Sequence, residues 1–295
     1  MHVPVLLQEV IDGLALSAGL TVLDGTINGA GHGLAIAKLI PGGYLIGLDR
    51  DAAAITQAEK ILVGLGCKVS LAVGNFRKLG VILDGLGIST IDRLFLDLGF
   101  SSNQLAAGRG FSFRSNEPLI MTYESEPAPN QLTAREIVNR WPIERLTQIF
   151  HDYGDEPFAR RISRAIVRVR AGRPIETTVE LVAVIRLAVP IWYRSHRRRH
   201  FATKIFQALR IAVNDELTAL EEVIRSGWDR LNPRGRIAII AFHSGEARII
   251  KNFFQTKVAD RTGRRPSRRV IKPSEEEIKA NPRASSATLR LIEKI

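Results

Sequence analysis

The sequence predicts an α/β protein in which a doubly wound parallel sheet carries an all-helical insertion. Apolar runs of strand length alternate with helical patterns from Leu20 to Asp97, which is typical of such sheets. A glycine-rich loop follows the first apolar run, at the position where doubly wound folds bind a nucleotide. The segment 105–199 shows no strand pattern. We therefore expect residues 1–104 and 200–295 to form the sheet domain and residues 105–199 to form the insertion.

The first predicted strand, Leu20–Leu23, leads through the loop Asp24–Gly33 into a predicted helix at Leu34–Ile40. Glycine lets the backbone approach a ligand closely, and a helix start offers free N–H groups. The glycines stand at positions 29, 31 and 33, so the third comes earlier than in the G-x-G-x-x-G pattern of dinucleotide sites. This spacing favours a ligand without a pyrophosphate, with S-adenosylmethionine as the main candidate. A plain tight turn has the same composition.

The second predicted strand, Gly43–Leu48, ends at Asp49. Asp49 lies 18 residues beyond Gly31, close to where dinucleotide folds place the acid that holds the ribose hydroxyls. It is also placed to cap the predicted helix Ala52–Leu62. Asp51 can serve as that cap instead, so both roles are compatible.

The third and fourth predicted strands, Lys68–Val73 and Ile91–Leu96, lead into Phe76 and Asp97. Ligands of doubly wound sheets bind outside the carboxyl ends of the strands. We therefore expect one ligand site to be lined by the residues at four strand ends: Asp24, Asp49, Phe76 and Asp97.

The insertion carries helix signals only. Thr133–Glu136 has the pattern of a capping box, and a second helix is predicted over Pro157–Ala171, with apolar residues at helical spacing. Its surface carries four arginines: Arg160, Arg161, Arg164 and Arg168. A further helix begins at Thr177-Thr178 and continues to Val189.

After the insertion, one long helix, Thr203–Arg225, is predicted to return the chain to the sheet. Its residues Gln207, Arg210 and Asn214 share one polar stripe, which is either a solvated face or a substrate contact. A turn at 232–236 feeds a fifth strand, Ile237–Phe242, and Thr288–Ile292 fits a final strand. Residues 261–269 are basic and contain Pro and Gly, so we expect a mobile loop there.

The charge is divided unevenly along the chain. Residues 1–150 contain 12 Lys/Arg and 14 Asp/Glu, a net charge of −2, whereas residues 151–295 contain 30 and 16, a net charge of +14. A basic half of this kind favours a polyanionic partner, most simply nucleic acid, over a protein that is basic by chance. Dense runs at 194–199 and 264–269 are typical of phosphate contacts without sequence readout.

Composition excludes other classes. The single cysteine, Cys67, allows no internal disulfide, and no Cys/His cluster has the spacing of a zinc site, so no metal is expected. The N-terminus has no signal-peptide pattern, and no apolar run approaches the ~20 residues that cross a bilayer. We expect a cytoplasmic protein without membrane attachment.

The chain resembles the ribosomal small subunit methyltransferase H family, which methylates the N4 amine of a cytidine in 16S rRNA. The matching motifs keep their order almost end to end. In the first half they are residues 2–10, Gly31-His32, 47–51, Gly74-Asn75-Phe76, 97–99, Ser101-Ser102, Gln104 and 109–113. In the second half they are 153–156, Phe158-Ala159, Arg161-Ile162, 206–211, 213–217, 242–244 and 281–284.

This resemblance implies a class I methyltransferase fold with a helical insertion for RNA recognition, and S-adenosylmethionine as cofactor. It places the cofactor contacts on Ala30, Gly31, His32, Asp49, Phe76, Asp97 and Gln104. The partner it implies is 16S rRNA in the small ribosomal subunit. A carboxylate that accepts an N–H of the target amine would make its nitrogen more nucleophilic, and Asp97 is the candidate for this catalytic role.

The chain departs from the family near the substrate side. After Phe113 the family has Pro-Leu-Asp-Met-Arg-Met, where this chain has Pro118 to Tyr123 with Ile120 and Thr122 in place of the acid and the arginine. Their loss motivates an alternative, a catalytically diverged RNA-binding or ribosome-assembly protein on the same fold. A dinucleotide oxidoreductase is disfavoured by the glycine spacing, and a DNA N4-methylase by the absence of its Pro-Pro-Tyr motif. The modified nucleotide and the oligomeric state, a homodimer included, stay open.

Overall fold

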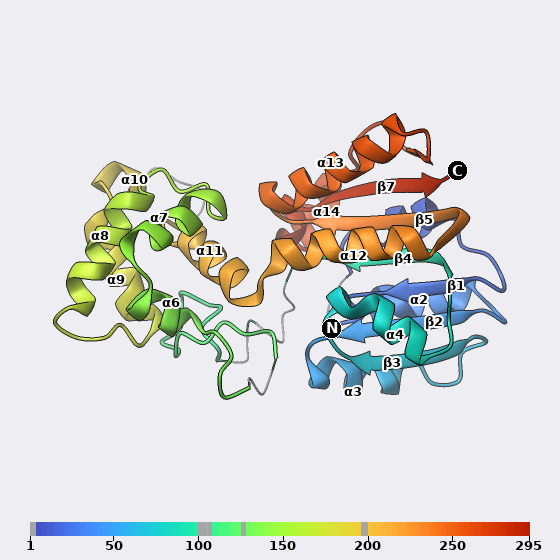
Figure 1. Ribbon diagram of the computed structural model, residues 1–295, viewed down its shortest axis with the longest axis horizontal. Helices are drawn as coiled ribbons and strands as arrows, with labels where there is room; N and C mark the ends of the chain where they lie inside the picture. Colours follow the sequence, from blue (N-terminus) through green and yellow to red (C-terminus); the bar gives the residue numbers. More distant parts are fainter. Residues whose placement is uncertain (1–3, 100–104, 106–107, 125–127, 196–199) are drawn as a thin grey trace. The chain divides into compact units, whose positions relative to one another are not determined.

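The computed structural model describes residues 4–99, 105, 108–124, 128–195 and 200–295. The chain divides into two compact units, one comprising Met1–Gly99 and Leu217–Ile295, the other Phe100–Glu216 (Figure 1). The predicted return to the sheet domain at residue 200 is therefore too early. Residues such as Ile205 and Leu209 pack in the core of the second unit, which keeps the segment up to Glu216 in that unit.

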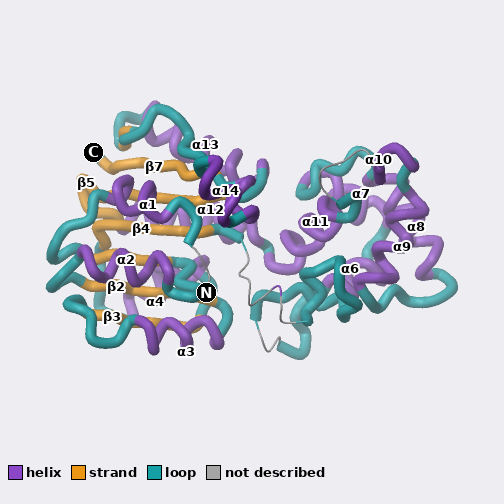
Figure 2. The backbone as a smooth tube through the Cα atoms, turned by 180° about the vertical axis from the view of Figure 1, so that it is seen from behind, coloured by secondary structure: helices purple, strands orange, loops and turns teal. Residues whose placement is uncertain are grey.

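The first unit is built on a seven-stranded sheet with the order β3-β2-β1-β4-β5-β7-β6. Strands β1 to β5 pair in parallel, and β7 pairs antiparallel with β5 and β6. Figure 2 shows the strands side by side in orange. The order reverses direction between β1 and β4, as in doubly wound folds, and confirms the predicted fold class. The strands are β1 (Thr21–Asp24), β2 (Tyr44–Asp49), β3 (Lys68–Val73), β4 (Ile91–Asp97), β5 (Leu231–Ala241), β6 (Gly263–Arg264) and β7 (Thr288–Lys294).

Helices cover both faces of this sheet, because its strands are apolar on both sides. Along β1, Val22 packs in one core and Leu23 in the other. The first core lies under α1 (Leu7–Leu14), α2 (Gly31–Leu39) and α3 (Ala52–Ile61). The second lies under α4 (Leu79–Gly85), α12 (Glu216–Arg230) and α13 (Ser244–Ala259). The short elements η1 (Phe76–Lys78), α14 (Glu275–Ala280) and η2 (Pro282–Ser286) complete the unit.

The second unit is helical, as predicted. Its described residues contain no strand beyond an isolated bridge between Pro118 and Thr177. Capping boxes begin two helices: Thr133 with Glu136, and Thr177 with Glu180. The helices are α6 (Ala134–Arg140), α7 (Ile143–Asp152), α8 (Ala159–Arg170), α9 (Thr178–Ala188), α10 (Ile191–Ser195) and α11 (Thr203–Asn214).

The single helix predicted over 203–225 is wrong. The structure has two helices, α11 and α12, separated at Asp215, whose φ of 48° is left-handed. The apolar pattern continues across the break, but it serves two different cores. Phe206 and Val213 pack in the core of the second unit, whereas Leu220 packs in the sheet unit.

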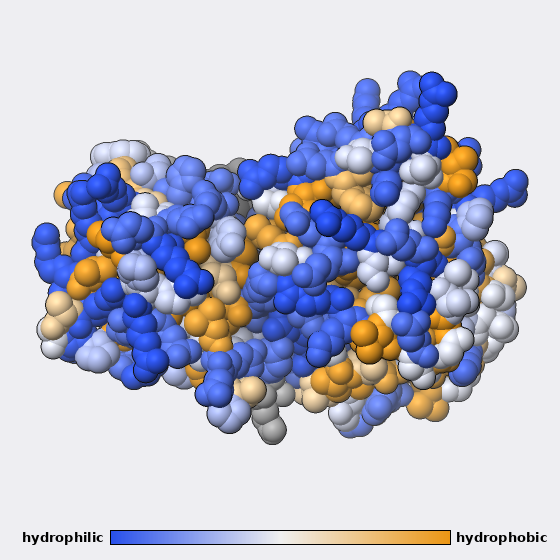
Figure 3. Space-filling view, viewed as in Figure 1, coloured by the Kyte–Doolittle hydropathy of each residue, from blue (hydrophilic) through white to orange (hydrophobic). Residues whose placement is uncertain are grey.

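The basic loop predicted at 261–269 is partly ordered into the sheet. Gly263 and Arg264 form β6 on the edge of β7, and Arg264 donates to Glu293 at 2.6 Å. The predicted turn at 232–236 lies inside β5, where the pairing register with β4 shifts. Within the described ranges, no helix is long and apolar enough to span a membrane. Hydrophilic side chains cover most of the face shown in Figure 3.

Candidate functional site

Three carboxylates end adjacent strands of the sheet unit. Asp24 ends β1, Asp49 ends β2 and Asp97 ends β4, and β1 pairs with both of the other strands. The strand order reverses between β1 and β4, and this switch point is where doubly wound sheets bind ligands. The predicted gathering of these acids at one sheet edge is therefore confirmed.

The glycine loop connects β1 to α2 at this edge of the sheet. Asn28 and Ala30 have φ values of 47° and 56°, so the chain turns sharply before α2 begins at Gly31. A Cβ added at Gly31 would lie 2.6 Å from Pro4 Cγ, so no larger residue fits without displacing Pro4. At Gly25 the same atom would lie 2.5 Å from Leu96 Cδ2. The glycines thus allow the loop to pack closely on Pro4 and Leu96 just before and at the start of a helix.

Asp49 is held by two backbone N–H groups and does not cap the helix that follows it. Its carboxylate accepts hydrogen bonds from Asn28 N at 3.0 Å and from Asp51 N at 2.9 Å. Asp51 caps α3 by accepting from Ala53 N at 3.0 Å. The cap role considered for Asp49 therefore belongs to Asp51. Burial raises the pKa of Asp49 to about 6, against the lowering effect of these hydrogen bonds.

Asp97 lies at the centre of the strand ends and has an unsatisfied oxygen. Its backbone N–H donates to Thr26 Oγ1 at 2.7 Å, but the buried Oδ1 has no hydrogen-bond partner among the described residues. Burial raises the pKa of Asp97 to about 8, and the nearby charges of Asp24 and Glu246 act in the same direction. A buried polar atom without a partner is costly, which marks a position prepared for a ligand group.

Asp24 is the most deeply buried of the three acids, with 1% of its surface exposed. Thr26 donates to its Oδ1 from the backbone N at 3.0 Å, whereas Oδ2 has no partner in the described part of the chain. Burial raises the pKa of Asp24 to about 7, since it outweighs the Thr26 hydrogen bonds. Two neighbouring carboxyls therefore each retain one unpaired buried oxygen.

His32 is buried in the first turn of α2 and does not cap it, because Ala30 occupies the N-cap position. Its Nε2 lies 3.0 Å from Val5 O, a carbonyl that can only accept, so Nε2 carries a proton. Nδ1 then faces Asp97 Oδ2 at 3.7 Å, within ion-pair range when the ring is charged.

Phe76 and Gln104 complete the predicted set. Phe76 follows β3 in η1, is half-buried, and its Cβ would lie 3.4 Å from a Cβ at Gly25. It is thus adjacent to the glycine loop while also packing on the second core of the sheet. Gln104 lies outside the described residues.

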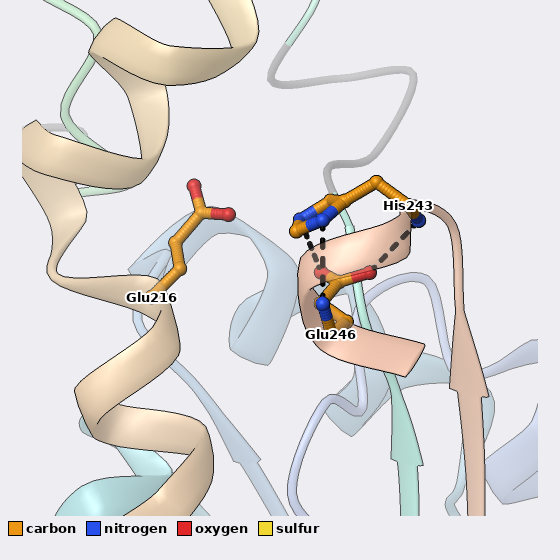
Figure 4. Close-up of side chains that lie close together, drawn as sticks. All are labelled: Glu216, His243 and Glu246. Atoms are coloured by element: carbon orange, nitrogen blue, oxygen red, sulfur yellow. Dashed lines mark hydrogen bonds and ion pairs between the residues drawn. The ribbon is translucent and has the colours of Figure 1, made fainter. Parts of the chain in front are cut away.

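Glu246 is a residue of the site that the sequence analysis did not single out. It forms a capping box with His243 at the start of α13, with His243 Nε2 and Glu246 Oε1 3.2 Å apart (Figure 4). Glu246 also accepts from Phe242 N at 2.8 Å and is only 3% exposed. The sequence signal that could have identified Glu246 is its position three residues after a polar residue at a strand end. The effect of Glu246 on the pKa of Asp97 arises from tertiary packing, which the sequence pattern does not reveal.

The polar stripe on α11 belongs to the second unit and is neither solvated nor free for substrate. Asn214 is 3% exposed, donates to Met121 O at 2.8 Å and accepts from Tyr123 N at 3.0 Å. Arg210 forms two 2.8 Å hydrogen bonds with Glu216. Gln207 donates to Tyr153 O at 2.9 Å. The three side chains of this stripe therefore connect α11 to other segments of the second unit by hydrogen bonds.

The segment that departs from the family pattern is also ordered within this unit. Thr122 is fully buried and donates to Glu124 O at 3.2 Å, and Ile120 is half-buried. The aromatic residues Phe111 and Phe113 pack on the helical core, with Phe113 stacked on His200 at 4.5 Å. Burial and packing therefore account for Thr122, Phe111 and Phe113.

Comparison with known proteins identifies the family of the chain. The family model of the MraW methylase family matches residues 1–295. A protein of Heliobacterium modesticaldum named ribosomal RNA small subunit methyltransferase H is 44% identical, covering 100% of this chain and 98% of its own length. Proteins of the same name from Fervidobacterium nodosum and Syntrophotalea carbinolica are 44% and 43% identical, each again over 100% of this chain. With a match of this extent, the chain belongs to the MraW methylase family.

Proposed function

We propose that this protein transfers a methyl group from S-adenosylmethionine to the N4 amine of a cytidine in 16S rRNA of the small ribosomal subunit. The family membership and the names of its relatives support an rRNA methyltransferase. The observation that carries the proposal at the level of residues is the unpaired buried Oδ1 of Asp97 at the strand switch point. A cytoplasmic location follows from such a substrate.

The residues at the strand ends fit S-adenosylmethionine. Its adenosine has a ribose diol and an adenine, and its methionine part carries positive charge. We assign the diol to Asp49, whose carboxylate is fixed by two backbone N–H groups, and the adenine to Phe76. The segment Ala30, Gly31 and His32 is assigned to the methionine part, since it forms the turn and first residues of α2, and the start of a helix offers backbone N–H groups to a ligand. Gln104 is assigned from the family resemblance alone.

The buried acids favour a cationic ligand. Asp24 and Asp97 each have an unpaired oxygen, and no Lys or Arg of the described residues forms an ion pair with either. A positive charge near these two carboxyls favours their ionised form, which burial alone disfavours. A dinucleotide would instead bring an anionic pyrophosphate toward three carboxyls, so the oxidoreductase alternative is disfavoured on charge as well as on glycine spacing.

The chemistry asked of the protein is modest. Bound S-adenosylmethionine supplies an electrophilic methyl group. The amine of cytosine is a poor nucleophile because its lone pair is delocalised into the ring. Asp97, once ionised, can accept an N–H from that amine, which localises the lone pair and stabilises the positive charge that develops. Much of the remaining rate enhancement comes from holding the two reacting atoms in line. The target base must leave its stack to reach the strand ends.

The test is methylation of small ribosomal subunits that lack the modification, followed by nucleoside mass spectrometry for N4-methylcytidine. The wild-type protein should form it, and Asp97→Asn should reduce turnover about 100-fold or more, as expected when a charged group no longer stabilises the transition state. Asp84→Asn is the matched control, because Asp84 is a 63% exposed surface acid paired with Arg230.

Wild-type protein that binds S-adenosylmethionine and subunits but forms no product would favour the alternative, a diverged RNA-binding or assembly protein. Normal turnover of Asp97→Asn would reject the catalytic role of Asp97 and leave the methyltransferase assignment intact.

A further inference from the structure

Helix α8 of the second unit exposes a row of arginines. Its twelve residues, Ala159–Arg170, include five arginines and no acid. Ala159, Ile162, Ser163 and Ile166 are buried against the unit's core. The four arginines of the opposite side are exposed: Arg160, Arg161, Arg164 and Arg168.

These four side chains lie on one narrow stripe. At about 100° per residue, positions 160, 164, 168 and 161 fall within an arc of about 100°, and the buried positions fall on the other side of the helix. Four positive charges so close together repel one another, which destabilises an isolated helix. The arrangement therefore has a cost that the fold itself does not require.

No described residue neutralises this stripe. None of the four arginines forms an ion pair or a hydrogen bond with another side chain of the described ranges. Other arginines of the same unit do have such roles. Arg170 donates to Val138 O and Trp141 O at 2.7 Å each. Arg140 and Arg173 pair with glutamates at 3.5 and 3.6 Å.

An aromatic pair adjoins the first turn of α8. Phe158 immediately precedes the helix and makes an edge-to-face contact with Trp192 of α10, with ring centroids 5.9 Å apart. Phe158 is half-buried, but Trp192 is 60% exposed. Trp192 thus contacts the residue that precedes the arginine-bearing helix, and exposed aromatics together with arginines bind unpaired nucleic acid by base stacking and phosphate contacts.

We propose that the α8 stripe (Arg160, Arg161, Arg164 and Arg168) together with Trp192 is a docking surface for an unpaired stretch of rRNA. The arginines contact successive phosphates and Trp192 stacks on a base. The identity of the RNA rests on the proposed function, but the binding of single-stranded RNA does not. The surface contributes affinity and position, without base-specific readout.

The test uses the full-length protein and two double variants of equal charge. Arg160→Gln/Arg164→Gln removes two charges from the stripe. Arg140→Gln/Arg173→Gln removes two exposed but glutamate-paired arginines of the same unit. Binding to a fluorescein-labelled single-stranded oligoribonucleotide is measured by anisotropy over a range of salt concentrations, and thermal melting checks that both variants fold.

The stripe variant should lower the slope of log affinity against log salt by about 1.4, that is about 0.7 for each phosphate that is no longer neutralised, whereas the control should keep the wild-type slope. Trp192→Ala should weaken binding about tenfold with the slope unchanged. On small subunits, the stripe variant should raise KM with little change in kcat and with wild-type affinity for S-adenosylmethionine.

Equal slopes for the stripe variant and its control would overturn the proposal, whatever the protein does to rRNA. Subunit binding that ignores salt and is instead abolished by changing the exposed Leu187 and Ile191 would also overturn it, in favour of a protein partner. If the wild type forms no methylated product but RNA binding still depends on the stripe, the proposed function fails and the docking surface stands.

Discussion

The affinity for S-adenosylmethionine should rise with pH between 6 and 8, chiefly through one carboxyl. Burial raises the pKa of Asp97 to about 8 in the free protein, so at pH 6 this group is protonated. A positively charged ligand beside it favours the ionised form and lowers its pKa in the complex. Binding at low pH must therefore release a proton, and the affinity must fall as pH falls below about 8.

The magnitude follows from the same values. If the pKa of Asp97 in the complex lies below 6, the fraction ionised in the free protein sets the effect. That fraction is about one half at pH 8 and about one hundredth at pH 6, so the dissociation constant should rise about 50-fold between them. Asp24, with a pKa of about 7, weakens binding further toward the lower end.

Calorimetric titration at several pH values, in pairs of buffers with different ionisation enthalpies, measures both the dissociation constant and the protons released. Asp97→Asn should remove most of the dependence above pH 7, while the surface variant Asp84→Asn should keep it. A wild-type dissociation constant that changes less than about threefold from pH 6 to 8 would refute the reasoning, as would an unchanged profile in Asp97→Asn.

Three further predictions concern stability. The pKa of Asp24 is raised in the folded protein from 3.8 to about 7, so the unfolding free energy falls as pH rises through that window and the buried group ionises. Asp24→Asn should therefore stabilise the ligand-free protein by about 2 kcal/mol at pH 8 but not at pH 4, as judged by thermal melting. Gly31→Ala should cost about 1–3 kcal/mol in urea unfolding, since its Cβ would meet Pro4 at 2.6 Å, whereas Gly29→Ala, with nothing nearer than 3.9 Å, should be tolerated. Asn214→Ala leaves buried backbone groups without partners and should cost about 3 kcal/mol, with cofactor affinity unchanged in calorimetry; a neutral effect would contradict the structural role of this side chain.

The strand ends could be predicted from the sequence because their signal is local. Three of the apolar runs are followed by an acid, and parallel strands bring their carboxyl ends to one edge. That rule alone places Asp24, Asp49 and Asp97 together. The cap of α3 could be narrowed to Asp49 or Asp51 from neighbours in the sequence, and the structure assigns it to Asp51.

The charge state of the site could not be predicted, since it arises from contacts distant in sequence. The unpaired Oδ1 of Asp97 and its proximity to Glu246 and His32 appear only when β1, β4, α2 and α13 are assembled. The division of the helix at Asp215 escaped prediction for a related reason. The apolar residues keep helical spacing both before and after Asp215. Periodicity does not reveal that those of α11 and those of α12 pack in two different cores.

The buried acids also explain why this edge of the sheet is a site and not only a junction of strands. The fold does not need the ionisable carboxyl of Asp97, because its buried Oδ1 accepts no hydrogen bond from the described residues and a neutral isostere would avoid the cost of burying an ionisable group. Asp24, one strand away, uses Oδ1 to hold Thr26 N but likewise has one buried oxygen, Oδ2, without a partner among the described residues. Two neighbouring carboxyls that each lower the stability of the ligand-free protein have a purpose if a bound cation offsets the cost of burying their charges. By this argument the ligand should stabilise the protein against unfolding more strongly at pH 8 than at pH 6, the opposite of what an anionic dinucleotide would do.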